Sequence, residues 1–361
     1  MNKDENQKIA QFCRIAQAAQ RSLPAGLNQS RVRLIQLLAD KWVNGTVLRY
    51  CFVDKGKFQQ KDGSWKEYQW SIPDADAEVV RQGFSVWKDV GIGLEFQEVS
   101  DRRQADIRIG FLRGDGAWSY IGKQIRQRQN DEITMNFGWD ISDDIDTAVH
   151  EIGHTLGFPH EHQNPNAGII WDEEAVYRAL AAPPNEWDRE TTFYNIIRKI
   201  SPDSVQGSSW DPDSIMHYPF GPGLIKEPAQ YRNGLTPAPG LSSRDVKWVR
   251  TFYPPLAETD PMVLQLYKSH AFDISPGQQV DFKIEPEATH QANIRTYGES
   301  DTVMVLFEQT DKGSVFVAGD DDSGLNTNAS LSVPLIAGRK YFVRIRLYYS
   351  ASQGSTVVMY S

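Results

Sequence analysis

Hydrophobic and polar positions divide the chain into three regions that predict different structures. The first, residues 1–40, carries apolar side chains at the i, i+3, i+4 and i+7 spacing that places them on one face of a helix. The clearest stripe of this kind comprises Ile9, Phe12, Cys13 and Ala16. In the second region, residues 41–256, strand-like alternation and helix-like spacing follow each other. The pattern therefore predicts a helical N-terminal segment followed by an α+β domain.

The third region, residues 262–361, follows a proline-rich run from Pro254 to Pro261. It contains short segments with strand-like alternation, such as QQVDFKIEP and KYFVRIRLYY, separated by Gly, Asp, Asn and Pro. Short strands spaced in this way over about 100 residues are typical of a β-sandwich. We therefore predict a second, all-β sandwich domain, and we expect a chain that ends near residue 258 to fold without it.

Composition and charge exclude several classes of protein. Of the 361 residues, 40% are hydrophobic and 24% are charged, which is typical of a soluble globular chain. The net charge of −9 argues against nucleic-acid binding, because few phosphate counterions would be released. No apolar run reaches the roughly 18 residues of a membrane span, and the N-terminus lacks the apolar run of a signal peptide. We therefore expect synthesis in the cytoplasm, with any export by a signal-independent route.

The stretch HEIGHTLGFPHEH, residues 150–162, has the spacing of a metal site. On a helix, His150 and His154 lie four residues apart and share one face, so both imidazoles can reach one zinc ion. Glu151 is rotated by about 100° from His150, which places it beside the metal, where a general base belongs. The competing interpretation is a polar helix face that happens to be rich in histidine.

The residues that follow favour the metal site. Gly157 can adopt a positive φ and end the helix, after which the chain can turn and bring His160 back to the same ion. Three protein ligands leave a zinc position open for water, as in catalytic sites. The sequence therefore predicts a catalytic zinc centre at His150, His154 and His160.

A second motif, DPDSIMHYPF, places Met216 in a tight turn two residues before Tyr218. The string H-E-x-x-H-x-x-G-x-x-H with a downstream methionine turn is the metzincin signature. Together with KWVNGTV, AWSYIG and LSSRDVKWVRTFY, these motifs make the region from about residue 41 to 254 resemble the astacin family of metzincin peptidases. The resemblance implies a metzincin-type fold with a twisted mixed sheet and an active-site helix, and the activity of a zinc endopeptidase acting on protein substrates.

The resemblance also implies roles for single residues. A zinc-bound water attacks the peptide carbonyl, Glu151 acts as the base, and Tyr218 is a hinged fifth ligand that swings away to stabilise the tetrahedral intermediate. Met216 forms an apolar floor under the zinc. Glu161 matches the acid that receives the new N-terminal amine once a pro-segment is cut, here near Lys41. The substrate lies extended along AWSYIG.

The sequence departs from the family at its cysteines. Two cysteines expected beside WSYIG and before the active-site helix are replaced by Ala117 and approximately Trp139, which is consistent with synthesis in a reducing compartment. The family's aspartate switch has no clear counterpart. For Cys13, three interpretations stay open: a thiolate on the open zinc position, a small buried apolar residue, or a bond to Cys51.

Four further interpretations concern the function, the C-terminal domain and two loops. The alternative function is a catalytically inactive, zinc-bearing adhesion or binding protein, against which the presence of Glu151 argues. For the C-terminal domain we expect a role in binding protein or glycan. The string RGD, residues 113–115, is interpreted as a chance loop. One acidic stretch has two competing interpretations, a calcium site and a solvated loop. The oxygen ligands of the calcium site would be Asp320, Asp321, Asp322 and Asn326.

Overall fold

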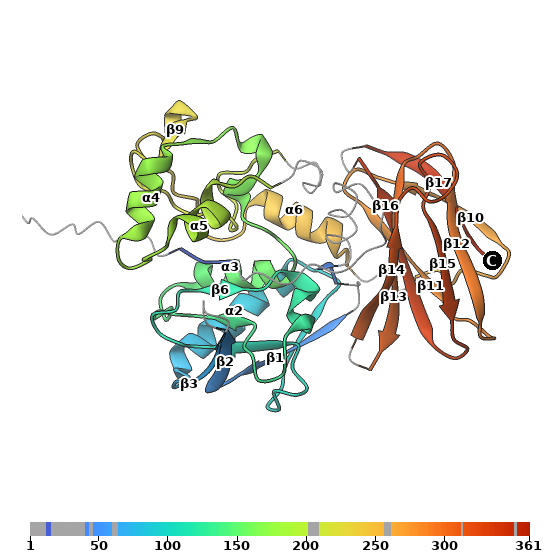
Figure 1. The fold of residues 1–361 in the computed structure, drawn as a ribbon, viewed down its shortest axis with the longest axis horizontal. Helices are drawn as coiled ribbons and strands as arrows, with labels where there is room; N and C mark the ends of the chain where they lie inside the picture. The colour runs from blue at the N-terminus through green and yellow to red at the C-terminus, as the bar shows by residue number, and fades with distance from the viewer. Residues whose placement is uncertain are drawn as a thin grey trace, which may run out of the picture.

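The computed structural model describes residues 12–15, 40–42, 46–59, 64–200, 209–255, 261–311, 313–349 and 352–361. Two parts lie side by side, an α+β part that carries the blue to yellow segments and an all-β part in orange and red (Figure 1). Within the described ranges, no helix has the length and apolar character needed to cross a membrane.

The α+β part is built on a mixed five-stranded sheet of order β4-β1-β5-β7-β6. Its strands are β1 (Val47–Phe52), β4 (Glu95–Glu98), β5 (Ile107–Gly110), β7 (Met135–Asn136) and β6 (Trp118–Ser119). The first four pair in parallel, whereas β6 is antiparallel to β7 and forms one edge. The strands β2 (Lys55–Gln59) and β3 (Trp65–Gln69) form a separate hairpin. The mixed sheet confirms the predicted fold class.

Two helices, α2 (Asp74–Asp89) and α3 (Ile145–Thr155), pack against each other beside this sheet. The apolar faces of both helices enter one core, in which Val80, Trp87 and Ile152 are almost completely buried. Between sheet strands runs the short helix η1 (Gly122–Gln127). Since α3 carries the predicted zinc motif, its burial fixes the position of that motif in the middle of the domain.

A second lobe follows α3 and has its own apolar core. Its elements are η2 (Glu161–Gln163), η3 (Pro165–Ala167), β8 (Ile170–Trp171), α4 (Glu173–Ala181), α5 (Arg189–Thr192), η4 (Phe193–Ile197), β9 (Ile225–Glu227) and η6 (Ala229–Tyr231). The helix α6 (Ser243–Phe252) closes the domain and starts at a capping box between Ser242 and Asp245. Phe12 and Cys13 belong to the core of this lobe, although they precede the first strand of the domain.

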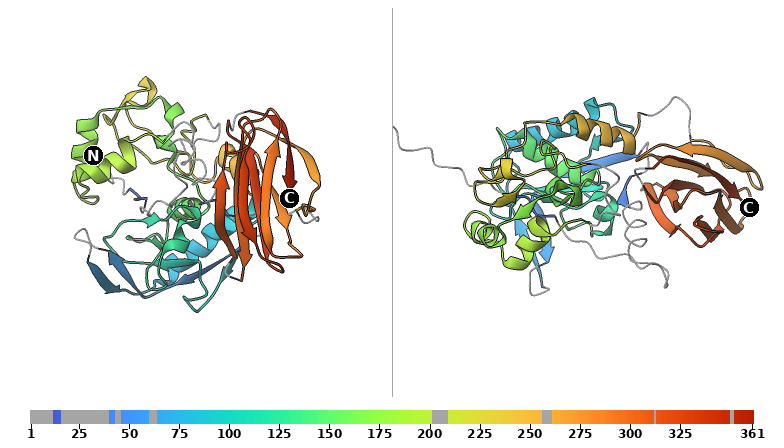
Figure 2. Two further views of the ribbon diagram at one scale, coloured as in Figure 1. Left: turned by 45° about the vertical axis from the view of Figure 1, so that its right-hand side comes forward. Right: turned by 90° about the horizontal axis from the view of Figure 1, so that it is seen from above.

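The C-terminal part is a sandwich of two antiparallel four-stranded sheets, as predicted (Figure 2). One sheet contains β10 (Ser269–Ile274), β17 (Gly354–Tyr360), β12 (His290–Tyr297) and β15 (Ser330–Leu335). The other contains β11 (Gln279–Ile284), β16 (Lys340–Leu347), β13 (Thr302–Thr310) and β14 (Gly313–Asp320). Alternate residues of each strand point inward, so that Leu306, Ile345 and Val358 meet in one core.

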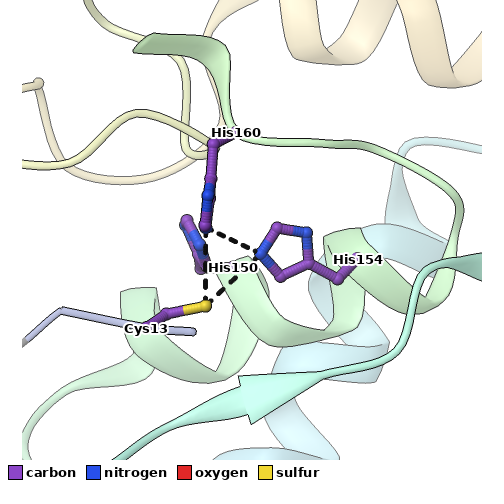
Figure 3. A group of neighbouring side chains, drawn as sticks. All are labelled: Cys13, His150, His154 and His160. Carbon is purple, nitrogen blue, oxygen red and sulfur yellow. Dashed lines mark hydrogen bonds between the residues drawn. The ribbon is translucent and has the colours of Figure 1, made fainter. Parts of the chain in front are cut away.

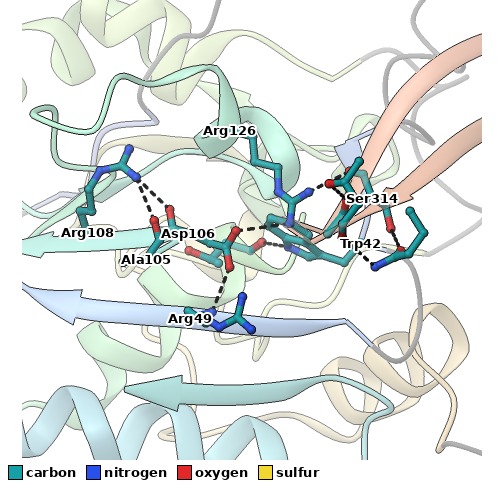
Figure 4. Close-up of polar contacts among 11 residues, drawn as sticks. Trp42, Arg49, Ala105, Asp106, Arg108, Arg126 and Ser314 are labelled. Atoms are coloured by element: carbon teal, nitrogen blue, oxygen red, sulfur yellow. Dashed lines mark hydrogen bonds and ion pairs between the residues drawn. The ribbon is translucent and has the colours of Figure 1, made fainter. Parts of the chain in front are cut away.

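The outer face of β16 and its neighbours packs on the α+β part. Arg344 is completely buried, pairs with Asp281 through two nitrogens, and donates to the carbonyls of Lys41 and Trp42. Arg126 also connects the two parts. Its guanidinium contacts Asp106 in the α+β part and donates to Ser314 O in the sandwich at 2.8 Å (Figure 4). Independent folding of the two parts stays a prediction. Hydrogen bonds of Arg344 and Arg126 nevertheless connect them across the interface.

Candidate active site

Helix α3 is held at both ends by local contacts. The side chain of Asp144 accepts a hydrogen bond from Thr147 N at 3.2 Å and caps the first turn. At the other end, Gly157 has a φ of +98°, which confirms the predicted left-handed turn. The amide of Phe158 then bonds to Gly153 O at 3.1 Å. This turn sends the chain back toward the helix, and His160 therefore returns to the face that carries His154.

The three predicted histidines meet, and a fourth side chain joins them. His150, His154, His160 and Cys13 each offer one ligand atom, and these atoms lie within 4.8 Å of one another (Figure 3). Nε2 of His154 lies 3.1 Å from Nε2 of His160, and Cys13 Sγ lies 3.4 Å and 3.5 Å from these two nitrogens. The motif supplies three histidines, and the sulfur of Cys13, for which a thiolate on the open zinc position was one of three interpretations, lies beside them.

The donor set fits zinc. Nδ1 of His150 lies 2.7 Å from Ile215 O, and Nδ1 of His154 lies 2.7 Å from Phe158 O. These contacts assign the proton to Nδ1 and leave the Nε2 lone pairs free for a metal. Nε2 of His150 is buried and has no hydrogen-bond partner in the described ranges. Burial lowers the pKa of His150 to about 4 and keeps the imidazole neutral, as a ligand must be.

Glu151 lies beside this cluster and points into a cleft. The cleft has a volume of about 980 Å³, and its wall includes Cys13, His150, Glu151 and Tyr218. Both carboxylate oxygens of Glu151 are buried and accept no hydrogen bond from the described residues. Burial raises the pKa of Glu151 to about 8, and the nearby Cys13 thiol offsets part of this effect. A carboxylate in this state can exchange a proton near neutral pH.

Tyr218 and Met216 both lie close to α3 and the residues of the cluster. The hydroxyl of Tyr218 donates to Cys13 O at 2.7 Å and contacts Nε2 of His160. Met216 packs below α3 so closely that a Cβ added to Gly153 would overlap its sulfur. The turn that carries both residues is anchored by Asp245, which accepts from Ser214 Oγ and Ile215 N.

Glu161 is placed away from the metal cluster. Its carboxylate accepts from Asp211 N and Asn164 Nδ2, both at 3.0 Å, and burial raises its pKa to about 7. It lines a cavity of about 90 Å³ whose wall also contains Lys41 and Gly157. This position agrees with the role that the family resemblance gives to Glu161, but the capture of a new amine stays a prediction.

Residues 12–15, which we call the plug, are not helical, in contrast to the prediction. The amides of Phe12 and Ile15 donate to the side chains of Asn185 and Asn195, at 3.1 Å and 3.0 Å. The amide of Arg14 donates to Ala117 O at 3.0 Å. These bonds to distant residues replace the i to i−4 bonds of a helix. The remainder of the predicted N-terminal helix, including Ile9 and Ala16, lies outside the described residues.

The other interpretations from the sequence have mixed outcomes. Cys13 and Cys51 are both free, so the predicted alternative of a bond between them does not occur. In the acidic loop, Asp320 accepts from Ser323 N, Ser323 Oγ and Ser330 N. Within the described ranges, the loop is not among the groups of side chains that could hold a metal. These bonds give Asp320 a structural role, and calcium binding stays a prediction.

Comparisons with known proteins identify the domain that contains this site. The model of the Astacin peptidase family matches residues 60–222. Bone morphogenetic protein 1 of Xenopus laevis is 33% identical over 166 residues, which are 42% of this chain and 21% of that protein. Zinc metalloproteinase nas-30 of Caenorhabditis elegans is 25% identical over 224 residues, which are 59% of this chain and 26% of that protein.

Among solved structures, one of myroilysin matches 61% of this chain and 98% of its own, with 28% identity and a TM-score of 0.51. The chain spans only about a fifth or less of the length of the first curated relatives. The match nevertheless contains the cluster of His150, His154 and His160. Residues 60–222 are therefore a zinc metallopeptidase domain of the astacin family, and an all-β region follows it in the chain.

Proposed function

We propose that the chain is a zinc-dependent endopeptidase that hydrolyses peptide bonds of protein substrates. The observation that carries this proposal is Glu151, a buried carboxylate without hydrogen-bond donors among the described residues, which lies beside the histidine cluster and faces an open cleft. An unsatisfied buried carboxylate is costly in a purely structural site. A general base, in contrast, requires a carboxylate that is available to accept a proton.

The residues of the site divide the chemistry among them. His150 and His154 would hold the zinc through the Nε2 atoms turned away from their backbone partners, and His160 would hold it through the Nε2 atom that faces the cluster. A zinc ion held there supplies Lewis acidity, which activates water and polarises a carbonyl group. Glu151 takes a proton from the attacking water and passes it to the leaving amine. The hydroxyl of Tyr218 donates a hydrogen bond to the oxyanion as its charge develops.

The plug supports the cleft as the place where a peptide binds. Its backbone is not helical, and it donates to Ala117 O, next to the edge strand β6, and to the side chains of Asn185 and Asn195. A substrate that replaces the plug would use the same carbonyl and would add itself to the sheet edge. The binding mode requires few specific side chains, because the bonds involve the backbone.

In the described conformation the site is latent. Cys13 brings a fourth donor to the cluster, and Tyr218 holds the carbonyl of the same residue. Since a zinc site with four protein ligands has no position for water, the plug must leave before hydrolysis. Of the three interpretations of Cys13, we infer the thiolate ligand, because its sulfur lies 3.4 Å and 3.5 Å from two histidine nitrogens; a bound zinc ion would have to offset the burial that raises the pKa of this thiol.

The same sulfur supports the second candidate function, a zinc-bearing binding protein without catalysis. A site with one cysteine and three histidines matches closed structural zinc sites. Against this candidate stand the cleft and the unpaired Glu151, which a closed structural site does not need. The binding role predicted for the β-sandwich stays a prediction.

The test compares Glu151→Gln with its parent, both in a Cys13→Ala background so that the sulfur cannot mask activity. The double variant should retain one zinc per chain but lose at least about a hundredfold in kcat, because glutamine cannot accept the proton. The control is Glu190→Gln, an equal change at an exposed position, which should leave the rate unchanged. Equal cleavage by the Glu151→Gln chain would contradict the proposed mechanism.

A further inference from the structure

The plug places a basic side chain against an acidic one, close in sequence to Cys13 and Ala117, which line the cleft. Arg14 follows Cys13 directly, and its amide bonds to Ala117 O. Nη2 of its guanidinium lies 3.8 Å from Asp115 Oδ1. Asp115 is therefore the acidic partner of Arg14, the residue that follows Cys13 in the plug.

The carboxylate of Asp115 is positioned by its surroundings. Oδ2 accepts a hydrogen bond from Trp118 Nε1 at 2.9 Å, and Trp118 lies in the edge strand β6. The loop is also held by a bond from Gly114 N to Gly138 O at 2.8 Å. Because the loop is bonded at both sides, the carboxylate keeps its orientation when the plug leaves.

The neighbouring cation does not neutralise this carboxylate. Arg113 pairs with Asp76 and also donates to Trp139 O. Its side chain is therefore engaged away from Asp115. The string RGD, interpreted from sequence as a chance loop, contains two side chains with separate roles. Arg113 holds the loop in place, and Asp115 contacts the plug.

The cleft itself favours positive charge. The described residues that line it include four aspartates and neither lysine nor arginine; the aspartates are Asp140, Asp143, Asp144 and Asp146. In the same wall, His217 is buried, and its Nε2 has no hydrogen-bond partner among the described residues. A cleft lined by one sign of charge attracts ligands of the other sign. The negative lining and Asp115 therefore point to the same class of substrate.

We propose that Asp115 determines substrate specificity by receiving the arginine or lysine side chain of a protein substrate, next to the bond that is cut. The basic side chain takes the position now held by Arg14, while the substrate backbone bonds to Ala117 O. Asp115 does not touch the reacting atoms, so its effect is on selection of the substrate. This inference rests on the proposed endopeptidase function.

The first test measures selectivity with pairs of peptides that differ only by Arg or Gln beside the cleaved bond, using the full chain with Cys13→Ala. The Arg peptide should have a kcat/KM at least about fivefold higher. Asp115→Asn should reduce this ratio to about one, and Asp115→Lys should reverse the preference in favour of Glu peptides. The control Asp273→Asn, an equal change at an exposed position of β10, should keep the ratio.

The second test needs no turnover. The rate at which Cys13 of the zinc-loaded full chain reacts with a thiol reagent reports departure of the plug, and mass spectrometry separates it from the buried Cys51. Arg peptides should accelerate this reaction more than Gln peptides, and Asp115→Asn should abolish the difference. Arg14→Gln alone should also accelerate it.

The outcomes distinguish the two proposals. Absence of cleavage for every peptide, together with a labelling difference that depends on Asp115, would contradict the endopeptidase but support the subsite. Cleavage or labelling with the same preference in wild type and Asp115→Asn would overturn the role of Asp115, whatever the overall rate.

Discussion

The sulfur of Cys13 lies 3.4 Å from Nε2 of His154, although 141 residues separate the two in sequence. Tyr218 fixes this approach, because its hydroxyl donates to the carbonyl of Cys13 at 2.7 Å. A side chain from the N-terminal region therefore joins the histidine cluster that helix α3 begins, where it would be a fourth ligand of a bound zinc ion. Under the proposed function, the plug would have to leave before a substrate reaches the site.

Replacement of Cys13 by alanine should open the site. With cobalt in place of zinc, wild type should show a strong sulfur-to-cobalt absorption band in the near ultraviolet, and Cys13→Ala should lose it, because the thiolate is a direct ligand. Peptide cleavage should rise in parallel. Cys51→Ala removes the other buried thiol and should change neither signal.

A comparison with a chain that starts at Lys41 separates the contributions of the sulfur and the backbone. If only this shorter chain gains activity, the backbone bonds of the plug to Ala117, Asn185 and Asn195 carry the latency. If neither variant gains activity, the plug has only a structural role.

Tyr218→Phe should lower kcat by roughly tenfold to a thousandfold and change KM little, because the hydroxyl acts mainly on the oxyanion. The measurement uses the chain that starts at Lys41, because the bond from Tyr218 to the backbone carbonyl of Cys13 would persist in Cys13→Ala. A large rise in KM at constant kcat would instead assign the hydroxyl to substrate binding.

Gly153→Ala should destabilise the domain by about 1–3 kcal/mol, because the new methyl group would overlap the sulfur of Met216 below α3. The double change Gly153→Ala with Met216→Ala should recover part of the loss. Gly221→Ala is the control, since no atom lies within 4 Å of its added Cβ. Thermal unfolding should give the lowest unfolding temperature for Gly153→Ala, a higher one for the double variant and the highest for Gly221→Ala. Equal unfolding temperatures for these three variants would contradict the close packing of Gly153 against Met216.

Arg344→Met should destabilise the full chain by about 3–5 kcal/mol, because the carboxylate of Asp281 would lose its buried partner. Arg344→Met with Asp281→Leu should restore much of this stability, since replacing both members of a buried ion pair by apolar groups is often neutral. Denaturant unfolding measures both. A single variant as stable as wild type would show that the interface contributes little.

The sequence predicts the centre of the site well, because its geometry is local. A helix fixes the separation of His150 and His154, and a glycine with positive φ fixes the return of His160. In the same way, alternation with period two predicts the sandwich strands, since each strand has one face in a common core.

The plug and the domain interface could not be predicted, because both depend on distant partners. Phe12 and Cys13 fit a helical stripe, but the backbone of the plug bonds to residues in another lobe, at Asn185 and Asn195. Arg344 occupies an outward position of a strand, which in sequence indicates contact with solvent. The structure covers that face with the carbonyls of Lys41 and Trp42.

The most direct test of the central claim is peptide cleavage by the Cys13→Ala chain before and after removal of zinc. A peptide library is incubated with the chain, with the chain treated with a chelator, and with the treated chain after about one equivalent of zinc is returned, and mass spectrometry identifies the products. We predict defined internal cleavage that disappears with the metal and returns with it. Cleavage at the same sites by the metal-free chain would contradict the account.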